Sequence, residues 1–343
     1  MARAGQPRAW AGPQENRRLT HITEPGTMQF SVYQQSHIGG RKVNQDRMGY
    51  SFTRDALLLV LADGMGGHLR GEMAATIMMQ TISALFQKQA TPYVKKPACF
   101  LQEAFLAAHH EIHRYRAEHA LPDTPRTTVV ACLIQHNTAI WAHCGDSRLY
   151  WMRRGQVLGR TRDHSHIEHL IAKGQAKPSE RATHPDRNKL YNCIGAGTLP
   201  KIEVASQASL QPGDVLLLCS DGLWSMLPDE EIVHRLATQT IVRAVPELIN
   251  MATTIAGATA DNTTALAIMW QGSPDVESPS TVTADMATVI STQMLPEDLV
   301  STTIPSTPEP EGPHEVDAFS DDEIEKAIAE IRGAIERSSQ LLK

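Results

Sequence analysis

Three apolar runs in this sequence end at an aspartate that has a glycine beside it. These aspartates are Asp63, Asp146 and Asp221, and a fourth, Asp261, comes just before the apolar run 264–270. Short apolar runs bounded by Gly and Asp predict buried strands, and a carboxylate at the tip of a buried strand is costly unless it meets a cation. Carboxylates, carbonyls and waters are the ligands that suit Mg²⁺ or Mn²⁺. The four aspartates therefore predict one shared cation site and metal-assisted chemistry on a phosphate.

Length and composition fit one large domain with additional segments at its ends. The chain has 343 residues, of which 41% are hydrophobic and 20% are charged. This allows a domain of about 240 residues with a sizeable core. No apolar stretch approaches the roughly 20 residues that span a bilayer, and residues 1–27 lack the apolar centre of a signal peptide. We therefore predict a cytoplasmic protein without a membrane span.

Charge and cysteine usage argue against two further classes. Residues 29–271 have 24 basic and 21 acidic residues, a net charge of +3, and show no basic stripe of the kind that predicts nucleic-acid binding. The cysteines form no CxxC pair, so we predict free thiols rather than a disulfide framework or a zinc site. They are Cys99, Cys132, Cys144, Cys193 and Cys219.

The central region contains alternating strand and helix signals. Predicted strands are 28–33, 57–62, 127–135, 139–143, 148–152, 156–159, 201–206, 215–220 and 263–270, and predicted helices are 71–89, 98–119, 165–173, 229–237 and 240–256. Residues 161–200 are polar and contain little apolar material. Such a long stretch in a compact domain predicts a flap at a functional site. We do not assign its scattered histidines as metal ligands, because histidines in a polar stretch usually lie on the surface or behind the ligands.

Both ends of the chain differ from the central region. Residues 1–27 are polar and predict a disordered extension, so Met28 competes with Met1 as the start. Residues 272–315 are rich in Pro, Ser and Thr and predict a linker. Residues 316–343 predict an acidic amphipathic helix that could dock on a partner or on the chain's own central domain. Its apolar seam is too short to be stable alone, and consists of Ile324, Ile328, Ile331 and Ile335.

Seven short motifs resemble, in this order, those of type 2C metal-dependent serine/threonine protein phosphatases of the bacterial branch. They are GGRKVNQD at 39–46, ADGMGGH at 62–68 with Gly71-Glu72 beyond, Thr127-Thr128, GDSR at 145–148, TRDHS at 161–165, SDGLW at 220–224 and DNTT at 261–264. Each motif alone is weak, but together they are specific and cover residues 28–271. The resemblance implies an α+β fold, a four-layer α-β-β-α sandwich of two antiparallel sheets flanked by helices, with flexible N- and C-terminal extensions.

The resemblance also implies a role for each acid. Asp63 would bridge two cations about 3.5–4 Å apart, with Asp221 and Asp261 as ligands of the second. Asp46 would hold metal-bound waters and orient the nucleophile, and Asp146 would complete a third, weaker metal position. The implied cofactors are two Mn²⁺ or Mg²⁺ ions with this third position. The implied catalytic residues are Asp63, Asp221 and Asp46, and the implied metal ligands are Asp46, Asp63, Gly64, Asp146, Asp221 and Asp261.

Three positions beside these acids bear on the chemistry. Arg41 fits a phosphate-binding role, because a guanidinium can bind two phosphate oxygens at once. Met65 stands where many eukaryotic relatives have a histidine that is a candidate acid for the leaving group. Met65 cannot donate a proton, so another group must act as that acid. Gln45 replaces the common glutamate and removes one negative charge beside the metal site.

The resemblance implies hydrolysis of phosphoserine and phosphothreonine on proteins by direct attack of a water bridged between two metals. The usual partner in the bacterial branch is a eukaryotic-like serine/threonine kinase together with its phosphorylated substrates. Two alternatives stay open. A partner-switching phosphatase would act on an anti-sigma-factor antagonist, and the flap sequence 161–200 would decide this. A non-catalytic pseudophosphatase scaffold would be expected to lack metal aspartates, and all of them are present.

Overall fold

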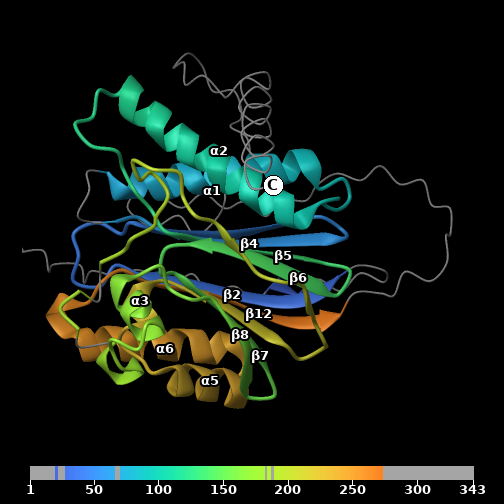
Figure 1. The fold of residues 1–343 in the computed structure, drawn as a ribbon. Helices are drawn as coiled ribbons and strands as arrows, with labels where there is room; N and C mark the ends of the chain where they lie inside the picture. The colour runs from blue at the N-terminus through green and yellow to red at the C-terminus, as the bar shows by residue number, and fades with distance from the viewer. Residues whose placement is uncertain (1–19, 22–27, 66–69, 182–183, 187–188, 273–343) are drawn as a thin grey trace, which may run out of the picture.

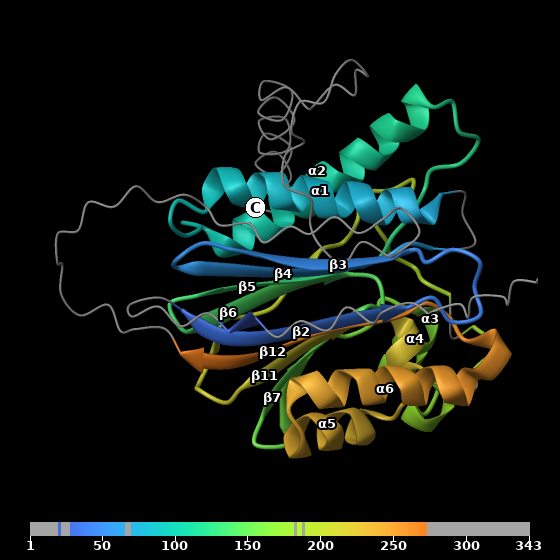
Figure 2. The ribbon, with the colours of Figure 1, turned by 180° about the vertical axis from the view of Figure 1, so that it is seen from behind.

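The computed structural model describes residues 20–21, 28–65, 70–181, 184–186 and 189–272. These residues form four layers, because two antiparallel sheets pack face to face and helices cover the outer face of each sheet (Figure 1 and Figure 2). The predicted α-β-β-α sandwich is therefore confirmed. Most of the predicted N-terminal extension, the linker from residue 273 and the C-terminal helix lie outside the described residues.

The first sheet contains the N-terminal and the C-terminal strands of the described chain. Its spatial order is β1-β2-β12-β11-β7-β8, so β12 lies between β2 and β11. The bounds are Thr20–His21 for β1, Gln29–His37 for β2, Arg148–Arg153 for β7, Gln156–Arg160 for β8, Val215–Cys219 for β11 and Thr263–Gly272 for β12. Helices α4, α5 and α6 cover this sheet, and span Asp221–Trp224, Asp229–Thr238 and Ile241–Ala256.

The second sheet has the order β10-β6-β5-β4-β3, with β9 also paired to β6. The bounds are Asp46–Phe52 for β3, Ala56–Asp63 for β4, Val129–Gln135 for β5, Thr138–Cys144 for β6, Glu203–Val204 for β9 and Ala208–Ser209 for β10. Helices α1, Gly71–Gln89, and α2, Pro97–Glu118, cover its outer face (Figure 2). The remaining helical elements are α3 His166–Ala172, η1 Pro178–Glu180 and η2 Gly257–Thr259.

Strand β4 shows how an unbroken apolar run is used in this fold. Successive side chains of a strand point to opposite faces. Leu57, Leu59 and Leu61 accordingly belong to the core between the two sheets, whereas Leu58 and Val60 pack in the core under α1 and α2. A third core joins the first sheet to α4, α5 and α6. Both faces of a strand buried in this way contact apolar cores, so its side chains are apolar at every position. This explains the continuous apolar sequence before Asp63.

Most predicted elements are found with small shifts at their ends, but three strands, β1, β3 and β10, were not predicted. β3 carries Arg47, Gly49 and Ser51 among its seven residues, so it lacks the apolar run of a buried strand. β1 lies within the segment predicted to be disordered, and its two residues pair with Val32 and Ser31 of β2. The five cysteines are free thiols, as predicted. No helix in the described part of the chain has the length and apolarity needed to cross a membrane.

Candidate active site

The pairing of β3 with β4 brings two of the predicted site acids together. Asp46 is the first residue of β3, Asp63 is the last residue of β4, and the two are direct partners in the antiparallel register. The Cα atoms of such partners lie about 4.5–5.5 Å apart. All residues of β4 before Asp63 are buried, so this strand delivers its carboxylate to the end of the sandwich.

Three further aspartates reach the same end from other connections. Asp146 lies in the turn between β6 and β7, Asp221 is the first residue of α4 directly after β11, and Asp261 precedes β12. All three lie close enough to Asp63 for their charges to raise the pKa of its carboxyl group, as Asp46 also does. The structure therefore gathers the five aspartates of the sequence prediction into one group, which we call the acidic cluster.

The environment of the acidic cluster disfavours negative charge. Burial is the largest cause of a raised pKa at each of four members, and neighbouring carboxylates add to it. The pKa of Asp146 is raised to about 7, and those of Asp63 and Asp221 are raised well above the usual range. Carboxylates this close cannot all ionise unless positive charge joins them.

Asp46 carries an oxygen whose hydrogen-bonding capacity is unused. Its side chain is fully buried, and Oδ2 accepts a hydrogen bond from the Ser220 hydroxyl at 2.8 Å. Oδ1 is also buried and has no hydrogen-bond partner among the residues that the structure describes. A buried acceptor without a partner is costly. An all-oxygen donor set of this kind fits Mn²⁺ or Mg²⁺.

Two glycines allow the backbone to approach closely around these acids. A Cβ at Gly64 would lie 2.3 Å from the carbonyl oxygen of Gly71, so the start of α1 packs directly on the tip of β4. Gly145 has a φ of +113°, and a Cβ there would lie 2.5 Å from the Cβ of Thr128. Only glycine takes such a conformation without strain, so both turns depend on the absence of a side chain.

Arg41 lies at the exposed edge of the acidic cluster. Its Nε donates to Oδ1 of Asp261 at 2.9 Å, and its Nη2 donates to Oδ2 at 2.6 Å. The side chains of Arg41 and Asp261 are 55% and 41% exposed. The hydrogen bond and charge of Asp261 raise the pKa of Arg41, with smaller contributions from Asp221 and Asp63. The structure thus places Arg41 beside the acids, in a bidentate pair with one of them, and its phosphate-binding role stays a prediction.

Asn262 was not singled out from the sequence, although it follows Asp261 in a quoted motif. Its side-chain amide donates to the carbonyl oxygens of Ile38 and Val43 at 2.9 and 3.2 Å. Its Oδ1 accepts from the backbone N–H of Gln45 at 2.8 Å. Asn262 therefore fixes the loop that carries Arg41. The signal available in the sequence was its place directly after a predicted ligand.

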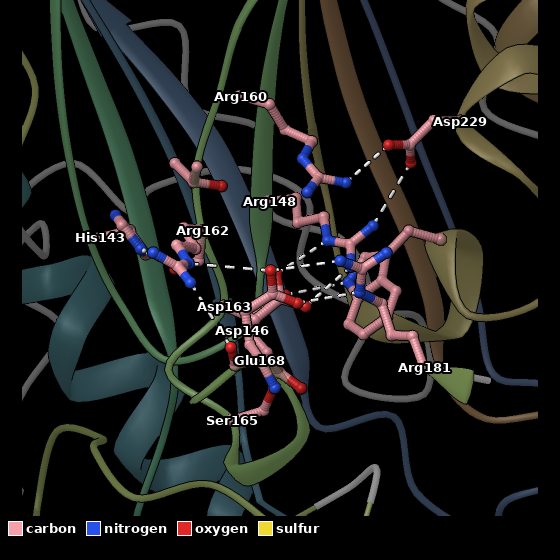
Figure 3. A network of polar contacts seen from close by, with 12 residues as sticks. His143, Asp146, Arg148, Arg160, Arg162, Asp163, Ser165, Glu168, Arg181 and Asp229 are labelled. Carbon is pink, nitrogen blue, oxygen red and sulfur yellow. Dashed lines mark hydrogen bonds and ion pairs between the residues drawn. The ribbon is translucent and has the colours of Figure 1, made fainter. Parts of the chain in front are cut away.

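The polar stretch 161–200 has an ordered base. We call residues 161–172 and 189–194 the flap base. Ser165 pairs with Leu190, so the two ends of the stretch lie side by side. Ser165 also caps α3 by accepting a hydrogen bond from the backbone N–H of Glu168. The Glu168 carboxylate in turn accepts two hydrogen bonds from Arg181, at 2.9 and 3.2 Å (Figure 3). The predicted short helix is confirmed, whereas the role of the stretch as a flap stays a prediction.

A second group of possible metal ligands lies beside the flap base. The ligand atoms of His143, His164 and Glu203 lie within 4.8 Å of one another. Nδ1 of His164, however, accepts hydrogen bonds from the backbone N–H of Gly145 and from the Asn192 amide, at 3.2 and 2.6 Å. Burial lowers the pKa of His164 to about 4, so its ring is neutral and Nε2, which faces Glu203, carries the one proton. A protonated nitrogen offers no lone pair to a metal, so His164 is a poor metal ligand in this tautomer.

Comparison with known proteins agrees with this fold. The profile of the protein phosphatase 2C family matches residues 33–259. The serine/threonine phosphatase stp of Listeria innocua is 29% identical over 232 residues, which are 66% of this chain and 90% of that protein.

Solved structures give the same result. The S. agalactiae serine/threonine phosphatase has a TM-score of 0.64 at 27% identity, covering 71% of this chain and 100% of that one. The catalytic domain of the phosphatase PstP, in complex with two manganese ions, has a TM-score of 0.60 at 25% identity, covering 71% of this chain and 99% of that one. The chain belongs to the protein phosphatase 2C family, and it is a metal-dependent protein serine/threonine phosphatase.

Proposed function

We propose that the acidic cluster is the catalytic centre and that it hydrolyses phosphoserine and phosphothreonine on proteins. The observation that carries this proposal is the gathering of five aspartates at strand ends, four of them with raised pKa values. Two Mn²⁺ or Mg²⁺ ions, and a third at a weaker position, would balance this charge. The proposed ligands are Asp46, Asp63, Gly64, Asp146, Asp221 and Asp261.

The proposed division of labour follows from where each side chain lies. The ions, when bound, would lower the pKa of a coordinated water and neutralise charge on the phosphate. The Ser220 hydroxyl holds one oxygen of Asp46. The other oxygen of Asp46 has no hydrogen-bond partner among the described residues, and it could accept a hydrogen bond from a metal-bound water and orient it. Asp63 lies opposite Asp46 in the strand pairing, and we propose that its carboxylate would be a ligand of both cations.

The ion pair of Arg41 with Asp261 supports a linked role for these two residues. Exposed ion pairs contribute only about 0–1 kcal/mol, so this pair opens at little cost. A cation bound to Asp261 would compete with Arg41 for the same two oxygens. That competition would release the guanidinium, which could then bind two oxygens of the substrate phosphate.

We also propose the wider setting of this activity. The bacterial relatives named as serine/threonine phosphatases support a role in reversing phosphorylation by a cognate eukaryotic-like serine/threonine kinase. The presence of all five proposed metal-site aspartates in one group argues against the pseudophosphatase alternative. An anti-sigma-factor antagonist stays as an alternative substrate. A panel of phosphorylated proteins, including such an antagonist and the autophosphorylated kinase, distinguishes the two by the ratio of kcat/KM values.

The proposal is tested by metal removal and restoration. We expect the full chain, after exhaustive chelation, to lose activity on a phosphothreonine peptide and on para-nitrophenyl phosphate. Mn²⁺ should restore it at least as well as Mg²⁺. Asp55→Asn is a suitable control, because Asp55 pairs with Arg54 at the surface, away from the acidic cluster. Full activity after chelation would contradict a metal-dependent centre at these aspartates.

A further inference from the structure

Arg148 is a buried arginine that fixes the base of the flap to β7. Its Nε donates to Oδ1 of Asp163 at 2.8 Å, and its Nη2 donates to Oδ2 at 2.7 Å (Figure 3). Both side chains are only 2% exposed. Such bidentate pairing fixes direction as well as distance. Because Asp163 lies at the start of the polar stretch 161–200, the flap base is held against the strand that follows Asp146.

One face of the same guanidinium contacts Trp224. The guanidinium carbon of Arg148 lies 3.6 Å from the centroid of the indole ring. The indole Nε1 donates at 2.9 Å to the carbonyl oxygen of Asp146. Trp224 is the last residue of α4, and α4 begins at Asp221. One arginine is therefore in contact with the flap base and with the tryptophan that connects two members of the acidic cluster.

The third nitrogen of Arg148 fixes its orientation. Nη1 donates to the Tyr150 hydroxyl at 3.0 Å and lies 3.4 Å from Oδ1 of Asp229. Asp229 also accepts a hydrogen bond from Arg160 at 2.6 Å (Figure 3). It accepts another from the Tyr150 hydroxyl at 2.8 Å. Every nitrogen of the guanidinium thus has a partner. The side chain cannot follow a displaced Asp163 without breaking contacts to β7, to α5 or to Trp224.

We propose that Arg148 and Asp163 are positioning residues that couple the base of the flap to the cation site. In this arrangement Asp163 of the flap base pairs with Arg148, and Arg148 stacks on Trp224. Trp224 then donates a hydrogen bond to the backbone of Asp146 and so keeps it beside the helix that begins at Asp221. Coupling between two sites is reciprocal. A cation bound at the acidic cluster must therefore stabilise the flap base in return. This inference rests on the proposed cation site.

The chain offers a matched control for the loss of a buried ion pair. Arg153 donates from Nε and Nη2 to the two oxygens of Asp214, at 2.7 and 2.8 Å, and the Asp214 side chain is fully buried. A tryptophan again lies beside the pair, because Trp151 donates to Asp214 at 3.0 Å. Arg153 lies five residues after Arg148 on β7, about 17 Å along an extended strand. Asp214→Asn therefore imitates the structural damage of Asp163→Asn away from the cation site.

The experiment compares Asp163→Asn, Asp214→Asn and the wild type as full chains stripped of metal. Titration calorimetry measures Mn²⁺ affinity, and hydrogen exchange measures the amides of residues 161–172 and 189–194 with and without Mn²⁺. We expect Mn²⁺ to slow exchange at the flap base of the wild type and of Asp214→Asn. In Asp163→Asn we expect at least about tenfold weaker Mn²⁺ binding, as for residues that orient metal ligands, and no such slowing.

Trp224→Phe keeps a ring over Arg148 and removes only the hydrogen bond to Asp146. This variant therefore tests the coupling to the cation site even if Asp163→Asn does not fold. We expect Mn²⁺ affinity to fall about fivefold, the effect of one ordinary hydrogen bond. Unchanged Mn²⁺ affinity in both variants, or an equal loss in Asp214→Asn, would overturn the coupling while leaving the cation site intact. A wild type that binds no Mn²⁺ would overturn the proposed site and this inference together.

Discussion

The acidic cluster and the network around Arg148 are both buried groups of charges, and they lie on neighbouring turns of the same fold. In the network, Asp163 and Asp229 meet guanidinium groups directly. In the acidic cluster, Asp46 and Asp63 face other carboxylates, and the arginine in contact with the cluster, Arg41, lies at its exposed edge. Each region contains a buried aspartate, Asp163 in the network and Asp46 in the acidic cluster, but only the network is balanced internally.

The balanced network is expected to stabilise the fold, whereas the unbalanced acidic cluster is expected to bind cations. Removing one partner of a buried ion pair leaves an uncompensated charge and typically costs about 3–5 kcal/mol. Removing one acid from a cluster of acids relieves repulsion instead. Substitutions in the two regions should therefore change the stability of the metal-free protein in opposite directions.

The largest expected effect comes from removing a central acid. Asp63→Asn and Asp221→Asn should each lower kcat by roughly 10³-fold or more, as for residues at a reaction centre. The thermal midpoint of the metal-free variants should be equal to or higher than that of the wild type, because like-charge repulsion is relieved. Steady-state kinetics and thermal unfolding in chelator measure the two effects. A large drop in the midpoint would place these acids with the balanced network.

Arg41 tests the boundary between the two kinds of charge. Arg41→Ala should raise KM for a phosphopeptide between about tenfold and a hundredfold, the range for hydrogen bonds to a charged group, with a smaller effect on kcat. Arg41→Lys should recover only part of this, because the bidentate geometry is lost. A kcat defect at unchanged KM would instead assign Arg41 to transition-state stabilisation.

A smaller effect is expected in the pH dependence of stability. The folded-state pKa of Asp146, about 7, lies above its unfolded value near 4, so protonation stabilises the folded state. This contribution is complete below pH 4 and is lost as the pH rises through 7. The free energy of unfolding of the metal-free protein should therefore increase as the pH falls from 8 to 6, by at most about 1.4 kcal/mol per pH unit for one proton. Denaturant unfolding should show a shallower dependence for Asp146→Asn.

The smallest effect is expected from deleting residues 273–343, which lie outside the described residues. Activity on para-nitrophenyl phosphate should not change, because every predicted site residue precedes this segment. The segment carries a net charge of −11. If it binds the catalytic domain as an inhibitor, its deletion should raise activity, and the increase should be larger at low salt. If it binds a partner, only activity on a protein substrate should fall. A truncated chain that does not fold would show that the segment belongs to the core.

The sequence was most informative where chemistry and strand formation coincide. Asp63 and Asp221 follow apolar runs, so their position at the ends of buried strands could be predicted. The direct pairing of Asp46 with Asp63 could not, because β3 has no apolar pattern and strand register depends on partners far away in the chain.

The network around Arg148 was also beyond prediction from the sequence. Arg148 and Asp163 both belong to recognised motifs, but fifteen residues and a hairpin separate them. A pattern of residue types shows which side chains are charged, but it does not show which of them form ion pairs. The same limit applies to Asn262, whose hydrogen bonds to the Arg41 loop span more than 200 residues.

The place of β12 in its sheet has a consequence for the timing of activity during biosynthesis. β12 is the last described strand, yet it lies between β2 and β11, and Thr263 pairs with His37. A ribosome adds about 5–20 residues per second, so β2 must wait on the order of 10–45 s for this partner. Until then the first sheet is split and Asp261 does not exist. If Asp261 is a metal ligand, as proposed, a nascent chain therefore cannot complete its cation site before nearly the whole catalytic domain has been synthesised.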